Sequence, residues 1–153
     1  MCALAPKPVI GITMGDPCGI GAEVIVKALA REDLRDRARY IVFGFSEQLA
    51  YTADAAEVSF PFRRDHHESI CRYPYDRVVL DYDEISFPAR MPREPSRLGG
   101  QASMDFCLDA IEAARRGIVD AIVTAPISKT SWALAGHKRY PGHTELLADK
   151  LKT

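Results

Sequence analysis

The sequence has almost no net charge and no long apolar run. Its 153 residues carry 20 Lys and Arg against 21 Asp and Glu. No overall field therefore favours nucleic acid or an anionic membrane. No apolar run approaches the roughly 20 residues of a membrane span, and residues 1–8 lack the apolar core of a secretory signal. We expect a cytoplasmic protein with no nucleic-acid partner and no membrane partner.

The usual motifs of metal and redox sites are also missing. The sequence has no H-E-x-x-H and no helical histidine pair, and the adjacent His66 and His67 should point in different directions on a strand. The scattered cysteines contain no C-x-x-C pair, which argues against a zinc knuckle or a redox motif. The sequence therefore predicts no metal site. The cysteines are Cys2, Cys18, Cys71 and Cys107.

Apolar runs alternate with amphipathic stretches along the chain. The runs predict buried strands at Val9–Met14, Tyr40–Phe45, Val78–Tyr82 and Val119–Thr124. Helical periodicity and start signals predict helices at Ala22–Ala30, Gln101–Arg116, Ser128–Leu134 and Thr144–Leu151, and a further helix starting at Ser46. Residues 58–75 indicate a solvated loop or edge, and three prolines exclude 88–95 from a regular interior. The alternation predicts an α/β fold with a largely parallel sheet flanked by helices.

A glycine-rich turn, Gly15–Gly21, joins the first predicted strand to the first helix. Small residues let the backbone approach a ligand closely, and free N–H groups at a helix start favour an anion. The spacing matches neither G-x-G-x-x-G nor a P-loop. Asp16 is therefore either close to a bound substrate or a residue that satisfies the amides of a tight turn.

A second candidate segment, Thr124–Lys129, follows the last predicted strand. Ligands of open α/β sheets bind beyond the carboxyl ends of the strands. Ser128 and Lys129 are thus candidates for contact with a phosphate or carboxylate. The alternative is a capped helix with a solvated lysine.

A third segment, Tyr140–Leu147, contains a Pro-Gly turn that delivers His143 and Thr144 to a helix start. An imidazole, a hydroxyl and free backbone N–H groups would converge there, which suits a phosphorylated or carboxylated substrate. The alternative is that His143 is structural or simply exposed.

Taken in order, these segments resemble the PdxA (4-hydroxythreonine-4-phosphate dehydrogenase) family. The matching phrases are G-D-P-x-G-I-G at 15–21, V-D-A-x-V-T-A-P-I-x-K at 119–129, A-G-H at 135–137 and Y-P-G-H-T-E-x-L-A at 140–148. The resemblance runs from about Lys7 to Thr153. It implies that residues 1–153 are the N-terminal part of a two-lobed α/β dehydrogenase similar to the isocitrate and isopropylmalate dehydrogenases. The last helix has no strand after it, so we expect a truncated fold.

The resemblance also implies an activity. The family carries out NAD-dependent oxidative decarboxylation of 4-phosphooxy-L-threonine in pyridoxal phosphate biosynthesis, as a homodimer with a divalent metal (zinc, magnesium or cobalt). Relatives act on threonate or erythronate 4-phosphate, and nothing in the sequence separates these substrates.

The resemblance assigns roles to few residues of this chain. His143 and Thr144 inherit substrate binding, and Asp16, Ser128 and Lys129 are expected near the substrate. The family's metal-binding histidines and most of its nicotinamide site lie farther along the chain, so no catalytic, cofactor or metal residue is assigned here. We expect the 153 residues alone to be inactive. The alternative is a non-catalytic α/β module that retains an anion pocket.

Overall fold

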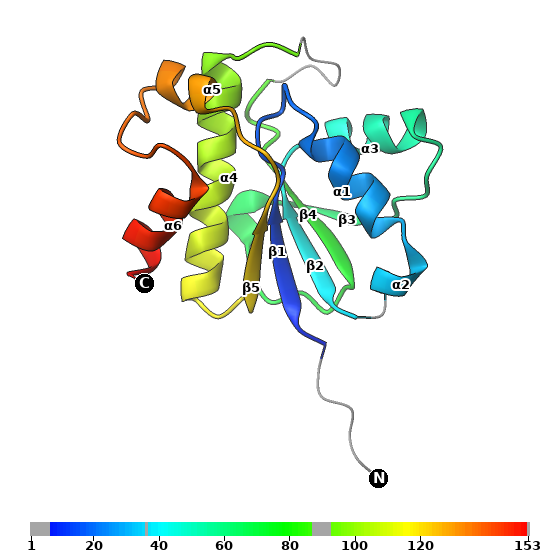
Figure 1. The fold of residues 1–153 in the computed structure, drawn as a ribbon. Coiled ribbons are helices and arrows are strands. Elements are labelled where there is room, and N and C mark those ends of the chain that lie inside the picture. Colours follow the sequence, from blue (N-terminus) through cyan, green and yellow to red (C-terminus); the bar gives the residue numbers. More distant parts are fainter. Residues whose placement is uncertain (1–6, 36, 87–92, 153) are drawn as a thin grey trace.

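Five parallel strands form one sheet in the order β3-β4-β2-β1-β5. The computed structural model describes residues 7–35, 37–86 and 93–152, drawn as a ribbon in Figure 1. The predicted α/β class with a parallel sheet is confirmed. The strands are β1 (Val9–Thr13), β2 (Arg39–Phe43), β3 (Arg63–His66), β4 (Arg77–Asp81) and β5 (Ala121–Thr124).

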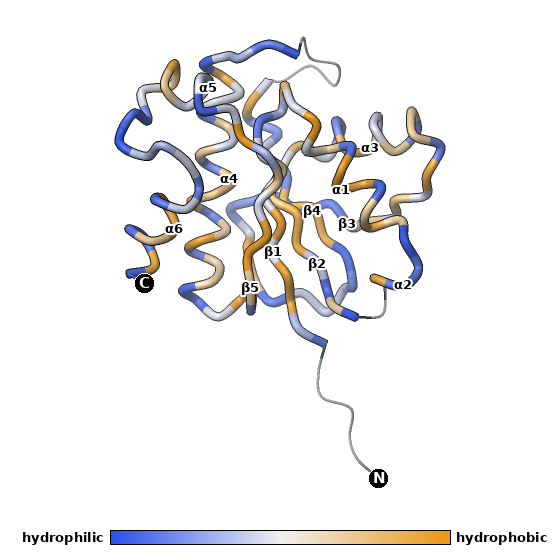
Figure 2. The backbone as a smooth tube through the Cα atoms, viewed as in Figure 1, coloured by the Kyte–Doolittle hydropathy of each residue, from blue (hydrophilic) through white to orange (hydrophobic). Residues whose placement is uncertain are grey.

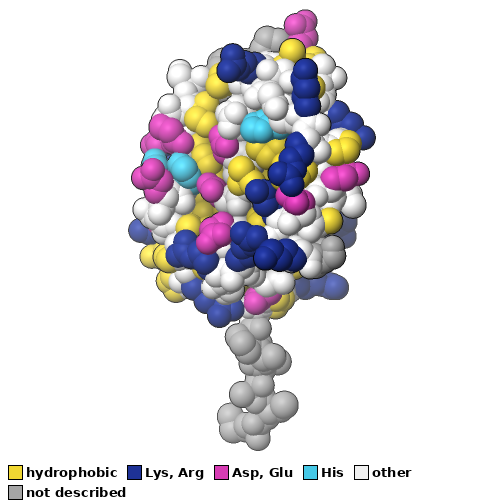
Figure 3. Space-filling view, turned by 90° about the vertical axis from the view of Figure 1, so that its left-hand side faces the viewer, with side chains coloured by type: hydrophobic (Ala, Val, Ile, Leu, Met, Phe, Trp, Pro, Cys, Tyr) yellow, Lys and Arg dark blue, Asp and Glu magenta, His cyan; other side chains and the backbone are white. Residues whose placement is uncertain are grey.

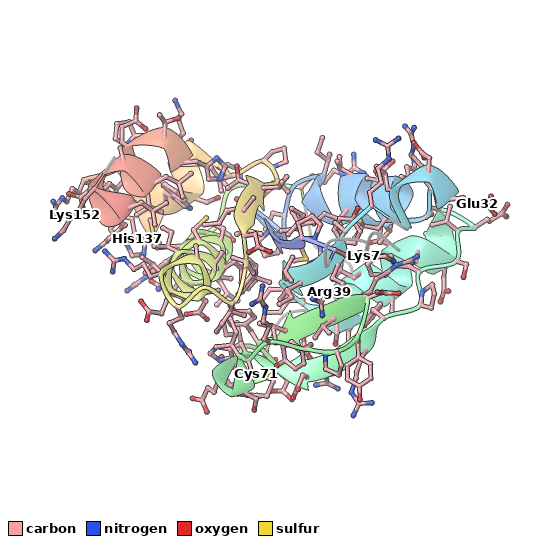
Figure 4. All side chains as sticks on the ribbon, turned by 90° about the horizontal axis from the view of Figure 1, so that it is seen from below. Lys7, Glu32, Arg39, Cys71, His137 and Lys152 are labelled. Carbon is pink, nitrogen blue, oxygen red and sulfur yellow. The ribbon has the colours of Figure 1, made fainter. Side chains whose placement is uncertain are left out.

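Helices cover both faces of this sheet (Figures 1 and 4). On one side lie α1 (Gly21–Leu29), α2 (Glu32–Arg35) and α3 (Ser46–Ala55), and on the other lies α4 (Arg97–Arg115). Against α4 pack α5 (Lys129–Leu134) and α6 (His143–Leu151), and a 3-10 turn (His67–Ser69) follows β3. Within the described ranges, no helix is both long enough and apolar enough to cross a bilayer.

The core follows from the apolar runs that predicted the strands. All five residues of β4 are buried, and Phe43 at the end of β2 is fully buried. Figure 2 shows apolar residues concentrated in β1, β2 and β4. The outer strand β3 is instead charged and partly exposed, which suits an edge because charged side chains discourage pairing with other chains.

The predicted elements are confirmed, with shifts at their ends. Helix α4 starts at Arg97 rather than Gln101 because the hydroxyl of Ser96 accepts a hydrogen bond from the N–H of Gly99, 2.9 Å away, and so caps the helix earlier. The poorly patterned region 58–75 supplies the edge strand β3. Residues 88–92 of the predicted irregular segment lie outside the described residues, and 93–95 belong to no helix or strand.

The start of α4 packs very closely against α5. A β-carbon placed on Gly100 would lie 2.0 Å from the carbonyl oxygen of Ser131 and 3.0 Å from the nitrogen of Trp132. Both neighbours are backbone atoms, so no side-chain rotation can make room. A residue larger than glycine would have to push the two helices apart.

We predict that Gly100→Ala destabilises the fold despite the better helix propensity of alanine. Overpacking of this kind costs about 1–3 kcal/mol, against a propensity gain of about 1 kcal/mol. The matched control is Glu112→Ala, at an exposed position farther along the same helix. Urea unfolding followed by circular dichroism would measure both. Equal stabilities for the two variants would show that the helices are not held this close.

Candidate functional site

The loops after β1 and β5 meet at the carboxyl edge of the sheet. The N–H of Asp16 donates to the carbonyl of Pro126 over 3.0 Å. Gly15 has φ +74°, and a β-carbon there would lie 2.2 Å from the same carbonyl oxygen. Only glycine fits such a left-handed conformation at this contact. The edge predicted to hold a ligand is therefore a tightly joined pair of loops.

Asp16 is an internal anchor of these loops. Its side chain is buried, with 4% of the residue exposed. One carboxylate oxygen accepts from the N–H of Cys18 at 2.9 Å, and the other accepts from the hydroxyl of Ser131 at 2.6 Å. These contacts support the local structural role that the sequence left open for Asp16.

Ser131 links three segments and was not predicted from the sequence. Besides donating to Asp16, its hydroxyl accepts from the N–H of Ser96 at 3.1 Å. Its own N–H donates to the hydroxyl of Ser128 at 3.1 Å, so Ser128 caps α5. The predicted capping role of Ser128 is thus present. Ser131 itself gives no local signal because its partner Asp16 is 115 residues away.

A cavity of about 280 Å³ lies between the loop after β1, the loop after β5 and residues 93–95. It contains two of the predicted substrate-proximal residues, Asp16 and Ser128, while Lys129 is exposed at the adjoining start of α5. Burial raises the pKa of the Cys18 thiol in the same wall, which disfavours a thiolate nucleophile. The lining residues are Asp16, Cys18, Gly19, Ile20, Arg93, Glu94, Pro95, Pro126, Ile127 and Ser128.

The predicted pair His143 and Thr144 begins α6, with Gly142 as its N-cap. Gly142 has an extended backbone and no side chain, so within the described ranges no side chain caps the first N–H groups of the helix. Lys129 reaches this point, because a β-carbon on Gly142 would lie 3.8 Å from its Cε. The carboxylate of Glu145 also lies close, at 3.4 Å from that β-carbon position. The structure thus brings Lys129, from the second predicted segment, close to the turn that precedes His143 and Thr144, a proximity that the sequence did not predict.

The ring of His143 packs edge-on against Trp132, with ring centroids 5.8 Å apart. Its Nε2 atom is buried and has no hydrogen-bond partner among the described residues. An unpaired buried polar atom of this kind costs about 1–3 kcal/mol, so it calls for an explanation such as a ligand. Burial lowers the pKa of His143, which favours the neutral imidazole. The donors around it suit an anion.

The residues that the structure describes form no metal-ligand set around His143. Among the described residues, the only group of three potential ligand residues lies elsewhere, at His66, His67 and Glu84. The expectation that His66 and His67 point apart is wrong, since their ring centroids are 4.9 Å apart. Strand β3 ends at His66 and a 3-10 turn begins at His67, so the alternation of side chains along a strand stops there.

Comparison with known proteins identifies a family and close structural matches. Residues 36–153 match the family described as "Pyridoxal phosphate biosynthetic protein PdxA". A provisionally named D-threonate 4-phosphate dehydrogenase of Oceanobacillus iheyensis is 35% identical over 98% of this chain and 45% of its own length. A 4-hydroxythreonine-4-phosphate dehydrogenase of Trichlorobacter lovleyi is 38% identical over 94% of this chain and 43% of its own length.

A crystal structure of a 4-hydroxythreonine-4-phosphate dehydrogenase from Burkholderia phymatum superimposes with a TM-score of 0.82 at 36% identity. The match covers 95% of this chain and 44% of that protein. The chain therefore spans less than half the length of the relatives it matches, and the five-stranded sheet with its flanking helices corresponds to part of a larger enzyme fold.

We predict that Ser131→Ala lowers the free energy of unfolding by about 1.5–3 kcal/mol, the contribution of a hydrogen bond to a charged group. The substitution leaves a buried oxygen of Asp16 and the N–H of Ser96 without partners. Thr130→Ala is the matched control, because Thr130 is the exposed neighbour in the same helix and should change stability by less than about 0.5 kcal/mol. Urea unfolding at pH 7.5 tests both. A loss no larger than that of the control would contradict the anchoring role.

A second prediction concerns acid stability. The pKa of His143 is lowered in the folded protein, whereas an unfolded histidine has a pKa of about 6.5. The unfolded chain therefore takes up a proton first, and this site lowers stability as the pH falls through about 6.5. His143→Asn should lose less stability than the parent between pH 7.5 and pH 5, measured by urea unfolding. Parallel losses in the two proteins would rule out a contribution from His143.

Proposed function

Because this chain belongs to the PdxA family, we propose that it forms the N-terminal lobe of an NAD-dependent dehydrogenase that acts on a small 4-phosphorylated hydroxy acid. The observation that carries the proposal is the buried Nε2 of His143, which has no partner among the described residues, beside a start of α6 that no described side chain caps. A phosphate oxygen is the kind of partner that both features lack.

We call Lys129, His143 and Thr144 the phosphate cluster. Each of these residues contributes a different interaction with the phosphate. A neutral His143 donates one hydrogen bond from Nε2, and Thr144 adds its exposed hydroxyl. Lys129 supplies positive charge, and the first N–H groups of α6 point toward the anion. Hydrogen bonds to a charged acceptor are about twice as strong as neutral ones. Together these groups bind the phosphate and orient the rest of the substrate.

Asp16 and Ser128 support the phosphate cluster and do not themselves contact the phosphate. Asp16 holds the loop after β1 to α5 through Ser131, and Ser128 caps the helix that begins with Lys129. Both also line the adjoining cavity. We assign them to positioning of the substrate-binding loops, with the body of the substrate occupying the cavity between those loops.

The substrate class follows from the two kinds of relative. We propose 4-phosphooxy-L-threonine, as in vitamin B6 biosynthesis, with D-threonate or erythronate 4-phosphate as the alternative. These molecules share a terminal phosphate and a hydroxyl near a carboxylate. The phosphate cluster binds the phosphate group, which all three molecules carry. The geometry of the cluster is therefore compatible with each of them.

In a protein of the relatives' length, a second lobe would complete the substrate cleft beside this one. We also propose that such a protein forms a homodimer. NAD would accept the hydride, and a divalent metal would polarise the new carbonyl. The described residues around His143 do not form a metal-ligand set, and the turn Gly15–Gly21 lacks a dinucleotide-binding spacing. We therefore assign the described residues to binding and orientation of the substrate and derive no step through either group.

We predict that His143→Ala weakens binding of a phosphorylated substrate about ten- to a hundredfold, since it removes a hydrogen bond to a charged group. Isothermal titration calorimetry of the 153-residue chain with D-threonate 4-phosphate would measure this. Unphosphorylated D-threonate should bind the parent at least about tenfold more weakly. The control is Thr130→Ala, whose side chain is exposed beside Lys129.

Two outcomes would contradict the proposal. If His143→Ala binds D-threonate 4-phosphate as tightly as the parent, His143 only packs the turn. If the parent does not distinguish the phosphorylated ligand from D-threonate, the cluster is not a phosphate site. In the full-length enzyme the same substitution should raise the KM for the phosphorylated substrate and leave the KM for NAD unchanged. Phosphate binding without turnover by that enzyme would support the non-catalytic alternative.

A further inference from the structure

Two neighbouring strands bring a second group of polar side chains together at their carboxyl ends. His66 ends β3, His67 begins the turn after it, and Glu84 follows the end of β4. Their ligand atoms all lie within 4.8 Å of one another. The carboxylate of Glu84 sits between the imidazoles, 2.9 Å from Nε2 of His67 and 3.6 Å from Nε2 of His66. Figure 3 shows histidine side chains beside acidic ones at the margin of one face.

We propose that His66, His67 and Glu84 form a binding site for a divalent transition-metal ion, with zinc as the best match. Two imidazole nitrogens and one carboxylate are a zinc-type donor set. Tetrahedral zinc with bonds of about 2.0–2.1 Å places its ligand atoms about 3.4 Å apart. The two nitrogen–oxygen distances given above lie on either side of that value. This inference is independent of the phosphate cluster and goes beyond the proposed function.

The surroundings of His67 distinguish this group from a chance surface cluster. Nδ1 of His67 lies 3.1 Å from a carboxylate oxygen of Asp109, which also accepts a hydrogen bond from the hydroxyl of Tyr82 at 2.8 Å. The Tyr82 ring stacks on the imidazole with centroids 4.1 Å apart and planes 14° apart. With Nδ1–H donating to Asp109, Nε2 is the nitrogen left to bind a metal ion, which would lie between Nε2 and Glu84. Metal-binding histidines are commonly oriented by a carboxylate in this way.

His66 is held less firmly. Its Nδ1 accepts a hydrogen bond from the N–H of Glu68 at 3.3 Å, and this bond is lost when Nδ1 carries the proton that metal binding through Nε2 requires. The carboxylate of Glu68, 3.9 Å from Nδ1, can then accept that proton's hydrogen bond. We therefore expect His67 to contribute more to affinity than His66. The remaining positions on the ion would be filled by water or by Asp83, 3.2 Å from Nε2 of His66.

The site lies well along α4 from the anchored loops. Asp109 is ten residues beyond Gly99, which abuts Asp16, so the two points are about 15 Å apart along the helix. The side chains of His67, His66 and Glu84 are 19%, 37% and 48% exposed. An ion there would exchange with solvent and would tie the edge strand β3 to the segment after β4.

The test is zinc titration of the metal-free 153-residue chain by isothermal titration calorimetry. We expect one equivalent to bind, and the double variant His66→Ala/His67→Ala to lose it. Asp109→Asn should weaken binding about 10–100-fold, the usual effect of removing an orienting carboxylate. Cobalt absorbance would report four-coordinate nitrogen and oxygen ligation. His137→Ala is the matched control, since His137 lies in the connection between α5 and α6 (Figure 4).

Three results would overturn the proposal. They are no zinc uptake by the parent, unchanged affinity in the double histidine variant, and a cobalt spectrum that shows thiolate ligands. In the first case the cluster is an ion-pair network of histidines and carboxylates only. Because His67 stacks on the buried Tyr82, the double variant could also disturb packing. Glu84→Gln keeps the shape of the site, and it should weaken zinc binding while the circular dichroism spectrum stays unchanged.

Discussion

The hydrogen bond between the hydroxyl of Ser131 and the carboxylate of Asp16 holds the carboxyl edge of the sheet together. It joins the loop after β1 to α5 across 115 residues of sequence. The same hydroxyl accepts from Ser96 at the start of α4, so one small side chain fixes three segments. The backbone of Ser131 is also the point at which α4 approaches α5 most closely, opposite Gly100. The placement of Lys129 next to α6 depends on this arrangement.

Most of the fold could be predicted because its information is local. In α4 the buried residues Phe106, Cys107 and Ala110 recur at helical spacing, and the centre of β4 is the apolar run 78–80. Strand β3 carries no such signal, since Arg63–His66 is charged and its position is fixed by backbone pairing with β4. The ends of helices and strands were predicted less well because residues outside the apolar pattern determine them. The start of α4 is set by a serine outside the apolar pattern.

The candidate site residues also differ in whether local sequence or tertiary contacts determine their position. Pro141 and Gly142 predict a turn before a helix, so the sequence could place His143 and Thr144 at the start of that helix. Neither the partner of Asp16 nor the approach of Glu84 to the paired histidines could be, because both contacts join segments that meet only in the folded sheet. The prediction that adjacent histidines diverge assumed a strand that continues, and the chain turns at that residue. Tertiary contacts therefore decide which of the polar residues found by motif lie in ligand sites.

The edge-on contact between Trp132 and His143 has an optical consequence. Trp132 is the only tryptophan in the chain and is almost fully buried, with its indole N–H donating to the hydroxyl of Ser103. Its emission therefore comes from one buried environment next to the imidazole. A protonated imidazole quenches indole fluorescence more strongly than a neutral one. The fluorescence intensity of Trp132 should therefore report, without a label, the protonation of His143 and the binding of a phosphate to it.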